Sequence, residues 1–128
     1  MGKRKMNPLS FDLGNALLAR HRQLCGNFTG NSETVSEELI RKAVISYTAL
    51  LRVVGAPESL ARGIGTYLEE VAAWCDAKKL PPVNALAINA ELGMPGPGFF
   101  TAPGASTNWE NDVRKCIACK NYPLEISN

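Results

Sequence analysis

The feature that most restricts the fold of this chain is a dense cluster of glycine and proline. Residues 93–104 contain four glycines and three prolines. Proline has no amide hydrogen to donate and glycine loses much conformational freedom on ordering, so no long helix or central strand passes through this segment. The alternating run at residues 83–89 comes just before it and is typical of a strand. We therefore expect a small β-hairpin over residues 83–100, with Phe99 and Phe100 anchoring its return.

The rest of the chain has the periodicity of amphipathic helices. Apolar residues recur every three to four positions over residues 10–24, 34–54, 58–79 and 106–120. Ser46 is a candidate N-cap that would split the second of these into two helices. The third follows a Gly55-Ala56-Pro57 turn and ends before Pro81-Pro82. This order predicts an α+β domain that is mostly α, with a helix-turn-helix or winged-helix-like core, a small hairpin and an extra N-terminal helix.

Two glycines interrupt the helix predicted over residues 58–79. Gly63 and Gly65 lie in its first half, and each costs about 1 kcal/mol relative to alanine in a helix interior. We expect that another backbone segment or a ligand comes close to the helix at these positions.

Length and charge set the domain organisation. The chain has 128 residues, a net charge of +2 and 45% hydrophobic residues, which predicts one folded domain. Residues 1–22 hold five basic side chains and one acidic side chain, so the positive charge gathers at the N-terminus. We divide the chain into a basic arm and helix over 1–33 and a winged-helix-like domain over 34–128.

The sequence contains no pattern typical of an enzyme, a cofactor site or a membrane protein. Cys116-x-x-Cys119 stands without a second pair to complete a zinc site, and His21 is the single histidine. No signal-peptide core and no stretch of about 20 apolar residues is present. We expect a non-catalytic cytoplasmic protein with no membrane partner, no metal and no cofactor, whose four cysteines are reduced thiols.

Two stretches flank the turn at residues 55–57. They read Ser46-Tyr47-Thr48-Ala49-Leu50-Leu51 and Ala61-Arg62-Gly63-Ile64-Gly65. Together they resemble the DNA-binding helix-turn-helix of alkylguanine-DNA alkyltransferases and alkyltransferase-like proteins, in which the arginine of an Ala-Arg-Ala-Val-Gly helix takes the place of a flipped base. The resemblance implies a winged-helix-like core in which Arg62 contacts DNA. The Pro-Cys-His-Arg motif of that family is absent, which excludes alkyl transfer.

A second pattern extends from Cys75 to Phe99. A helix ending in Cys75 is followed by Leu80-Pro81-Pro82, by Asn89 and by Leu92-Gly93-Met94-Pro95-Gly96-Pro97-Gly98-Phe99. This is similar to a family of small bacterial domains typical of mobile elements, including integron cassettes. That resemblance implies no particular activity.

Two functions fit this sequence. The first is a nucleic-acid-binding module that uses Ser59, Arg62 and Thr66 on the 58–79 helix and the basic arm Lys3, Arg4 and Lys5. The alternative is a protein-interaction module, in which an exposed loop bearing Met94, Phe99 and Phe100 binds a partner or a second copy of the chain without binding DNA.

Overall fold

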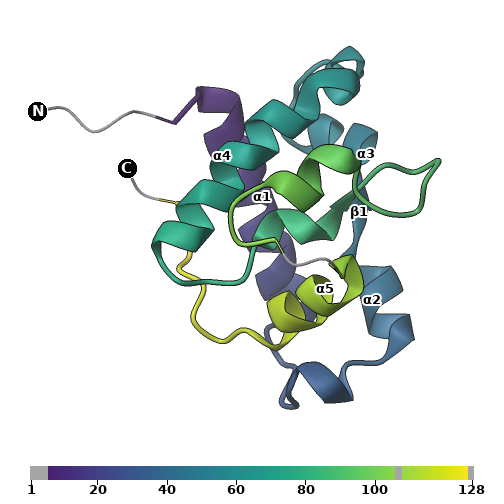
Figure 1. Ribbon diagram of the computed structural model, residues 1–128, viewed down its shortest axis with the longest axis vertical. Coiled ribbons are helices and arrows are strands. Elements are labelled where there is room, and N and C mark those ends of the chain that lie inside the picture. The colour runs from purple at the N-terminus through teal and green to yellow at the C-terminus, as the bar shows by residue number, and fades with distance from the viewer. Residues whose placement is uncertain (1–5, 106–107, 127–128) are drawn as a thin grey trace, which may run out of the picture.

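The computed structural model describes residues 6–105 and 108–126 (Figure 1). Helices dominate it, so the α+β, mostly α class predicted from the sequence is confirmed. The α-helices are α1 (Pro8–Cys25), α2 (Glu37–Ala43), α3 (Tyr47–Val53), α4 (Ile64–Ala77) and α5 (Trp109–Ala118). Short 3-10 helices join them: η1 (Ser32–Thr34), η2 (Glu58–Gly63), η3 (Val83–Leu86) and η4 (Pro97–Thr101). The strands are β1 (Ile45–Ser46) and β2 (Ala87–Ile88).

The two strands pair in parallel, which differs from the predicted hairpin. Ile45 lies opposite Ala87 and Ser46 opposite Ile88. The expected β-hairpin over residues 83–100 is wrong. Residues 83–86 form a buried 3-10 turn, and β2 pairs in parallel with β1, which precedes it in the chain, rather than with a following strand. Proline interrupts the segment beyond β2, so it offers too few amide donors for a return strand. One antiparallel bridge, Asn89 to Met94, is what remains of the hairpin, and the described residues contain no wing.

Ser46 separates α2 from α3, as the sequence predicts. Its hydroxyl oxygen accepts a hydrogen bond from the Ala49 amide at 3.2 Å, which is the N-cap arrangement. The backbone is extended from Val44 to Ser46, and its residues Ile45 and Ser46 pair with β2. A capped break therefore turns one periodic stretch of sequence into two helices joined by a strand.

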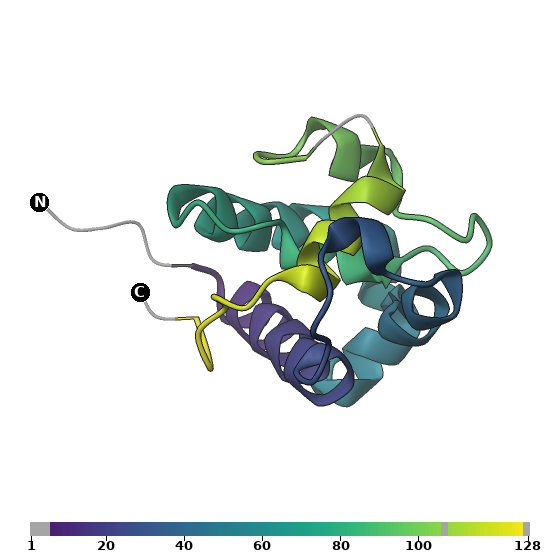
Figure 2. The same cartoon turned by 90° about the horizontal axis from the view of Figure 1, so that it is seen from below.

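The helices pack around one hydrophobic core. Figure 2 shows α1 at one edge of the molecule and the η4 segment at the opposite edge, with α4 between them. Leu13 and Leu17 of α1, Val71 of α4 and Val113 of α5 are fully buried in the same core. Gly14 lies where a methyl group would overlap the Cδ1 atom of Ile126. The C-terminal segment therefore packs directly on α1.

Arg20 links α1 to the end of α2. Its guanidinium donates to the carbonyl oxygens of Lys42, Ala43 and Val44 at 2.7 to 3.0 Å. These carbonyls lie where α2 ends and intrahelical partners are missing. Arg20 is one of the five basic residues at the N-terminus, and its side chain makes hydrogen bonds within the fold.

None of the helices in the part of the chain that the structure describes is long and apolar enough to span a bilayer.

Candidate nucleic-acid interface

The three predicted contact residues Ser59, Arg62 and Thr66 share one side of the molecule. Ser59 and Arg62 lie in η2, where three residues complete a turn, so side chains three apart project the same way. Thr66 follows one turn later, in α4. All three side chains are exposed. The exposure of Arg62 is what a contact with nucleic acid requires.

The predicted helix over residues 58–79 begins differently from the expectation. Its first six residues form the 3-10 helix η2, and the α-helical part begins at Ile64. Pro57 precedes η2 without a side-chain cap, and Gly63 and Gly65 weaken the α-helical preference here. The row of Ser59, Arg62 and Thr66 therefore crosses a junction between two helix types.

The side chains of this row are free of internal partners. Ser59, Arg62 and Thr66 make no hydrogen bond or ion pair with any other residue in 6–105 or 108–126. A side chain held by no neighbour is available to a ligand without first breaking a contact.

Gly63 and Gly65 leave the backbone beside this row uncovered. A Cβ atom at either position would meet no described atom within 4 Å. The expected close approach of another part of the backbone is therefore not seen within the described residues. The open space leaves room for an external molecule at the start of α4.

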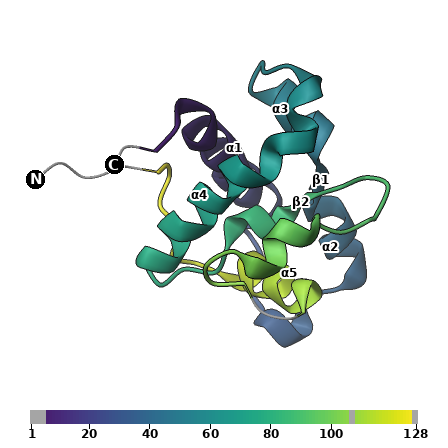
Figure 3. The ribbon, with the colours of Figure 1, turned by 45° about the horizontal axis from the view of Figure 1, so that its top comes forward.

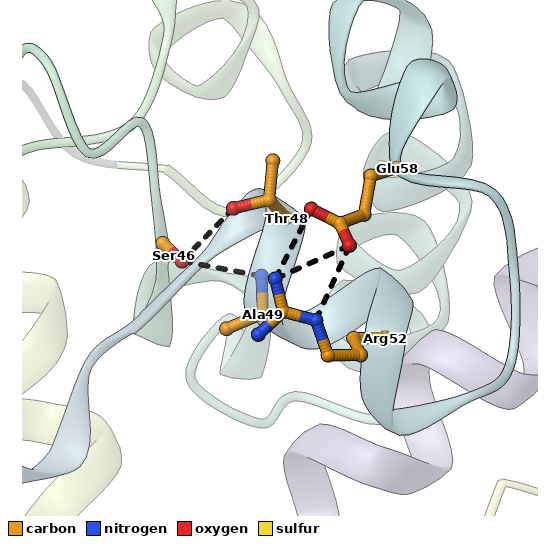
Figure 4. Close-up of polar contacts among 5 residues, drawn as sticks. All are labelled: Ser46, Thr48, Ala49, Arg52 and Glu58. Atoms are coloured by element: carbon orange, nitrogen blue, oxygen red, sulfur yellow. Dashed lines mark hydrogen bonds and ion pairs between the residues drawn. The ribbon is translucent and has the colours of Figure 1, made fainter.

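A neighbouring arginine is already neutralised. Arg52, at the end of α3, holds the carboxylate of Glu58 through both Nε and Nη2 at 3.1 to 3.2 Å, across the turn that joins α3 to η2 (Figure 4). Such an exposed pair contributes at most about 1 kcal/mol to stability. Among the residues that the structure describes, Arg52 is therefore paired with a carboxylate at this surface, whereas Arg62 is not.

The basic arm joins the molecule beside α4. Glu70 accepts hydrogen bonds from the Asn7 amide at 3.3 Å and from the Ser10 hydroxyl at 2.5 Å. These bonds fix the first described residues against the helix that carries Thr66. Lys3, Arg4 and Lys5 lie outside the described residues.

The predicted protein-interaction loop is only partly exposed. Met94 and Phe100 are 39% and 37% exposed, whereas Phe99 is 7% exposed. The expected exposure of Phe99 is wrong, because η4 turns its ring into the core while Phe100 packs edge-on against it. Leu92, which sequence reasoning missed, is 57% exposed on the same loop. Figure 3 shows the segment between β2 and η4 projecting from the body of the molecule.

The loop is attached to α3 by Tyr47. The Gly96 amide donates to the Tyr47 hydroxyl oxygen at 2.8 Å. Burial raises the pKa of Tyr47, while the bond from Gly96 opposes that rise, so the hydroxyl stays protonated at neutral pH. At the far end of the loop, the Asn89 amide donates to the Met94 carbonyl oxygen at 2.9 Å.

Burial raises the pKa of the Cys25, Cys75 and Cys116 thiols and keeps them protonated. Burial raises the pKa of Cys75 to about 11, and it raises that of Cys116 well above the ordinary value. The Cys116 thiol donates to the Pro82 carbonyl oxygen at 2.9 Å. Within residues 6–105 and 108–126, no three histidine, cysteine or acidic side chains are placed to hold a metal ion.

His21 is a buried structural residue rather than a surface base. Its Nε2 atom lies 2.7 Å from the Cys116 carbonyl oxygen, which makes it the donor and assigns the proton to Nε2. Burial lowers its pKa, despite that hydrogen bond. His21 therefore connects α1 to α5 and is neutral near pH 7.

Comparison of the chain with protein-family models, with curated proteins and with solved structures finds no match.

Proposed function

We propose that this protein is a non-catalytic nucleic-acid-binding module of the cytoplasm. The observation that carries the proposal is the exposed row of Ser59, Arg62 and Thr66, whose side chains make no hydrogen bond to the residues that the structure describes and which lies beside uncovered backbone. Arg62 would bind phosphate, and the two hydroxyls would donate hydrogen bonds to the same backbone. Lys3, Arg4 and Lys5 would add phosphate contacts from the arm that joins α4 at Glu70.

The charge on this surface sets the strength of binding. One unpaired arginine and three arm cations supply few phosphate contacts, and Glu58 and Glu69 lie on the same elements. Each phosphate contact contributes about −0.9 to the slope of log affinity against log salt. Binding should therefore be weak and strongly dependent on salt.

The test compares two arginine variants on one short labelled duplex at two salt concentrations, read by fluorescence anisotropy. Arg62→Ala should weaken binding and reduce the salt slope by about 0.9. Arg41→Ala is the control, because Arg41 is an exposed arginine on α2, away from the row, where it pairs with Glu37. No binding by the wild-type protein, or equal losses in the two variants, would contradict the proposal.

One observation favours a protein-interaction module as the second candidate. Leu92 and Met94 expose apolar surface on the projecting segment between β2 and η4, and Phe100 does so in the adjoining η4. Exposed apolar patches are typical of partner surfaces, and self-association is the simplest case. In sedimentation equilibrium, Leu92→Ser should weaken self-association, whereas Leu124→Ser, at an exposed leucine in the C-terminal segment, should not. A wild-type monomer at all concentrations would contradict self-association.

A further inference from the structure

A cavity of about 150 Å³ lies where the end of α1 meets the C-terminal segment, residues 119–124. These two parts of the chain lie side by side in Figure 2, and Arg22 Nη1 donates to the Leu124 carbonyl oxygen at 3.1 Å between them. A cavity of about this volume accommodates a molecule the size of benzene, which has about six non-hydrogen atoms. The space is therefore large enough for a small organic ligand.

Two cations line this cavity, and none of the described residues that line it is acidic. Arg22 on α1 and Lys120 just beyond α5 both have exposed side chains. Lys120 Nζ lies 5.6 Å from the centre of the Phe28 ring and makes no ion pair with the described residues. The C-terminal ends of α1 and α5 also lie here, and each is equivalent to about half a negative charge, so the two full positive charges outweigh them. The cavity therefore favours an anion.

The positive field of these cations extends to the inner wall of the cavity. His21 is part of that wall and is 6% exposed. Burial is the main cause that lowers the pKa of His21, hydrogen bonds with the backbone oppose it, and the charges of Lys120 and Arg22 lower the pKa further. The charges that disfavour a proton on His21 would attract a negative group placed beside it.

The guanidinium of Arg22 has one edge that suits a carboxylate. Its Nη1 bonds to Leu124, whereas its Nε and Nη2 make no hydrogen bond with the described residues. These two nitrogens present parallel N–H bonds, which match the two oxygens of a carboxylate. The bond to Leu124 restrains the guanidinium in advance, which reduces the entropy lost when a ligand binds.

Apolar walls define the rest of the ligand. Leu18, Pro123 and Leu124 contribute hydrocarbon to the lining, and Leu124 is 73% exposed. Covering such a side chain with an alkyl group is favourable, because apolar surface is removed from water. We propose that this cavity binds a small alkyl carboxylate, with its carboxylate on Arg22 and Lys120 and its alkyl group against Leu18 and Leu124.

The test uses butyrate as the probe and follows the full chain, labelled with ¹⁵N and with ¹³C in its methyl groups, by NMR. The Gly26 amide and the Leu18 methyl signals should shift in a saturable way, with a dissociation constant on the order of 1 mM. n-Butanol keeps the alkyl group without the charge and n-butylammonium reverses the charge, so both should leave these signals unchanged. Inorganic phosphate has the charge without the alkyl group and should bind at least about threefold more weakly. No shift with butyrate, or equal affinity for phosphate, would overturn the proposal.

A pair of lysine variants tests the contribution of charge. Lys120→Gln should weaken butyrate binding about threefold. Lys78→Gln is the matched control, because Lys78 is an exposed lysine just after α4 whose Nζ lies 5.8 Å from the centre of the Trp74 ring. Lys78 does not line the cavity, so its variant should bind butyrate like the wild type. Equal effects of the two variants would overturn the proposal.

Arg22→Lys tests the paired N–H edge separately from the charge. It keeps the cation but removes the planar fork, so butyrate binding should weaken about tenfold. The amide spectrum of the variant without ligand shows whether the fold is retained. Wild-type affinity in this variant would overturn the assignment of the carboxylate to Arg22.

Discussion

Two regions of this molecule treat their polar side chains in opposite ways. In the packed region, formed by α1, the end of α2, α5 and residues 119–126, the side chains of Arg20, His21 and Tyr122 donate to backbone carbonyl oxygens. In the open region, residues 58–66 and 89–96, Arg62 and the two hydroxyls beside it bond to nothing described. The same residue type therefore stabilises the fold in one place and is left free for a ligand in the other. Charge counts along the sequence do not distinguish the two uses.

Arg20→Ala should give the largest effect and is the direct test of this comparison. Truncation leaves three carbonyl oxygens at the end of α2 without their donor. Because hydrogen bonds from charged groups are among the strongest, we expect a loss of about 2–3 kcal/mol in the free energy of unfolding. Urea denaturation followed by circular dichroism measures it. A loss below that of Arg22→Ala, whose exposed side chain makes one such bond, would remove the distinction between the regions.

A pair of tyrosine variants should give an intermediate effect. Tyr122 donates its hydroxyl hydrogen to the Pro81 carbonyl oxygen at 2.6 Å inside the packed region. Tyr122→Phe leaves that part-buried carbonyl unpaired and should cost about 1–2 kcal/mol. Tyr47→Phe removes a bond that holds the open loop and should cost less. Its main result should be faster amide exchange at Gly96, measured by NMR. The opposite order of stability losses would show that the loop is the more tightly held element.

Stability should also depend on pH through His21. Its pKa is lowered in the fold below the ordinary value of about 6.5, so the unfolded chain binds a proton more readily. The free energy of unfolding should be at its full value above pH 6.5 and fall as the pH drops toward the folded pKa of His21. Thermal midpoints measured across this range, with His21→Gln as the control, test the link. An equal decline in the variant would assign it to carboxyl groups instead.

Arg62→Ala should have the smallest effect on folding. The side chain is exposed and makes no bond to the described residues, so the free energy of unfolding should change by less than about 0.5 kcal/mol. Thermal denaturation beside Arg20→Ala gives the clearest contrast between the two regions. A larger loss would mean that Arg62 is a structural residue, and the nucleic-acid interface would lose its central group.

Local sequence patterns predicted the structural features that depend on residues close together in the chain. Helical periodicity located the helices, and Ser46 marked the break between α2 and α3. Each of these follows from contacts within a few positions of the chain. The 3-10 character of η2 escaped detection because it has nearly the same apolar spacing as an α-helix.

Features built from distant segments could not be predicted in this way. Two-residue strands carry no alternating pattern, so nothing in the sequence paired Ile45 with Ala87. The sequence gives no sign that Arg20 is bonded within the fold, because its carbonyl partners at the end of α2 are more than 20 residues away in the chain. A small hollow lined by Tyr47, Asn84 and Phe99 likewise forms only when α4 and the glycine-proline segment come together. The exposure of Phe99 was mistaken because composition alone does not show which ring of a pair faces inward.

The short parallel pairing of β1 with β2 has a consequence for how the chain folds. It closes a loop of about 40 residues that contains α3, η2 and α4. The entropy of closing such a loop must be overcome before four residues can pair, so these strands should join after the helices between them have docked. Weakening the pair should then accelerate unfolding and leave the folding rate nearly unchanged. The β1–β2 pair would therefore form late in folding and control the unfolding rate, which sets the lifetime of the native state.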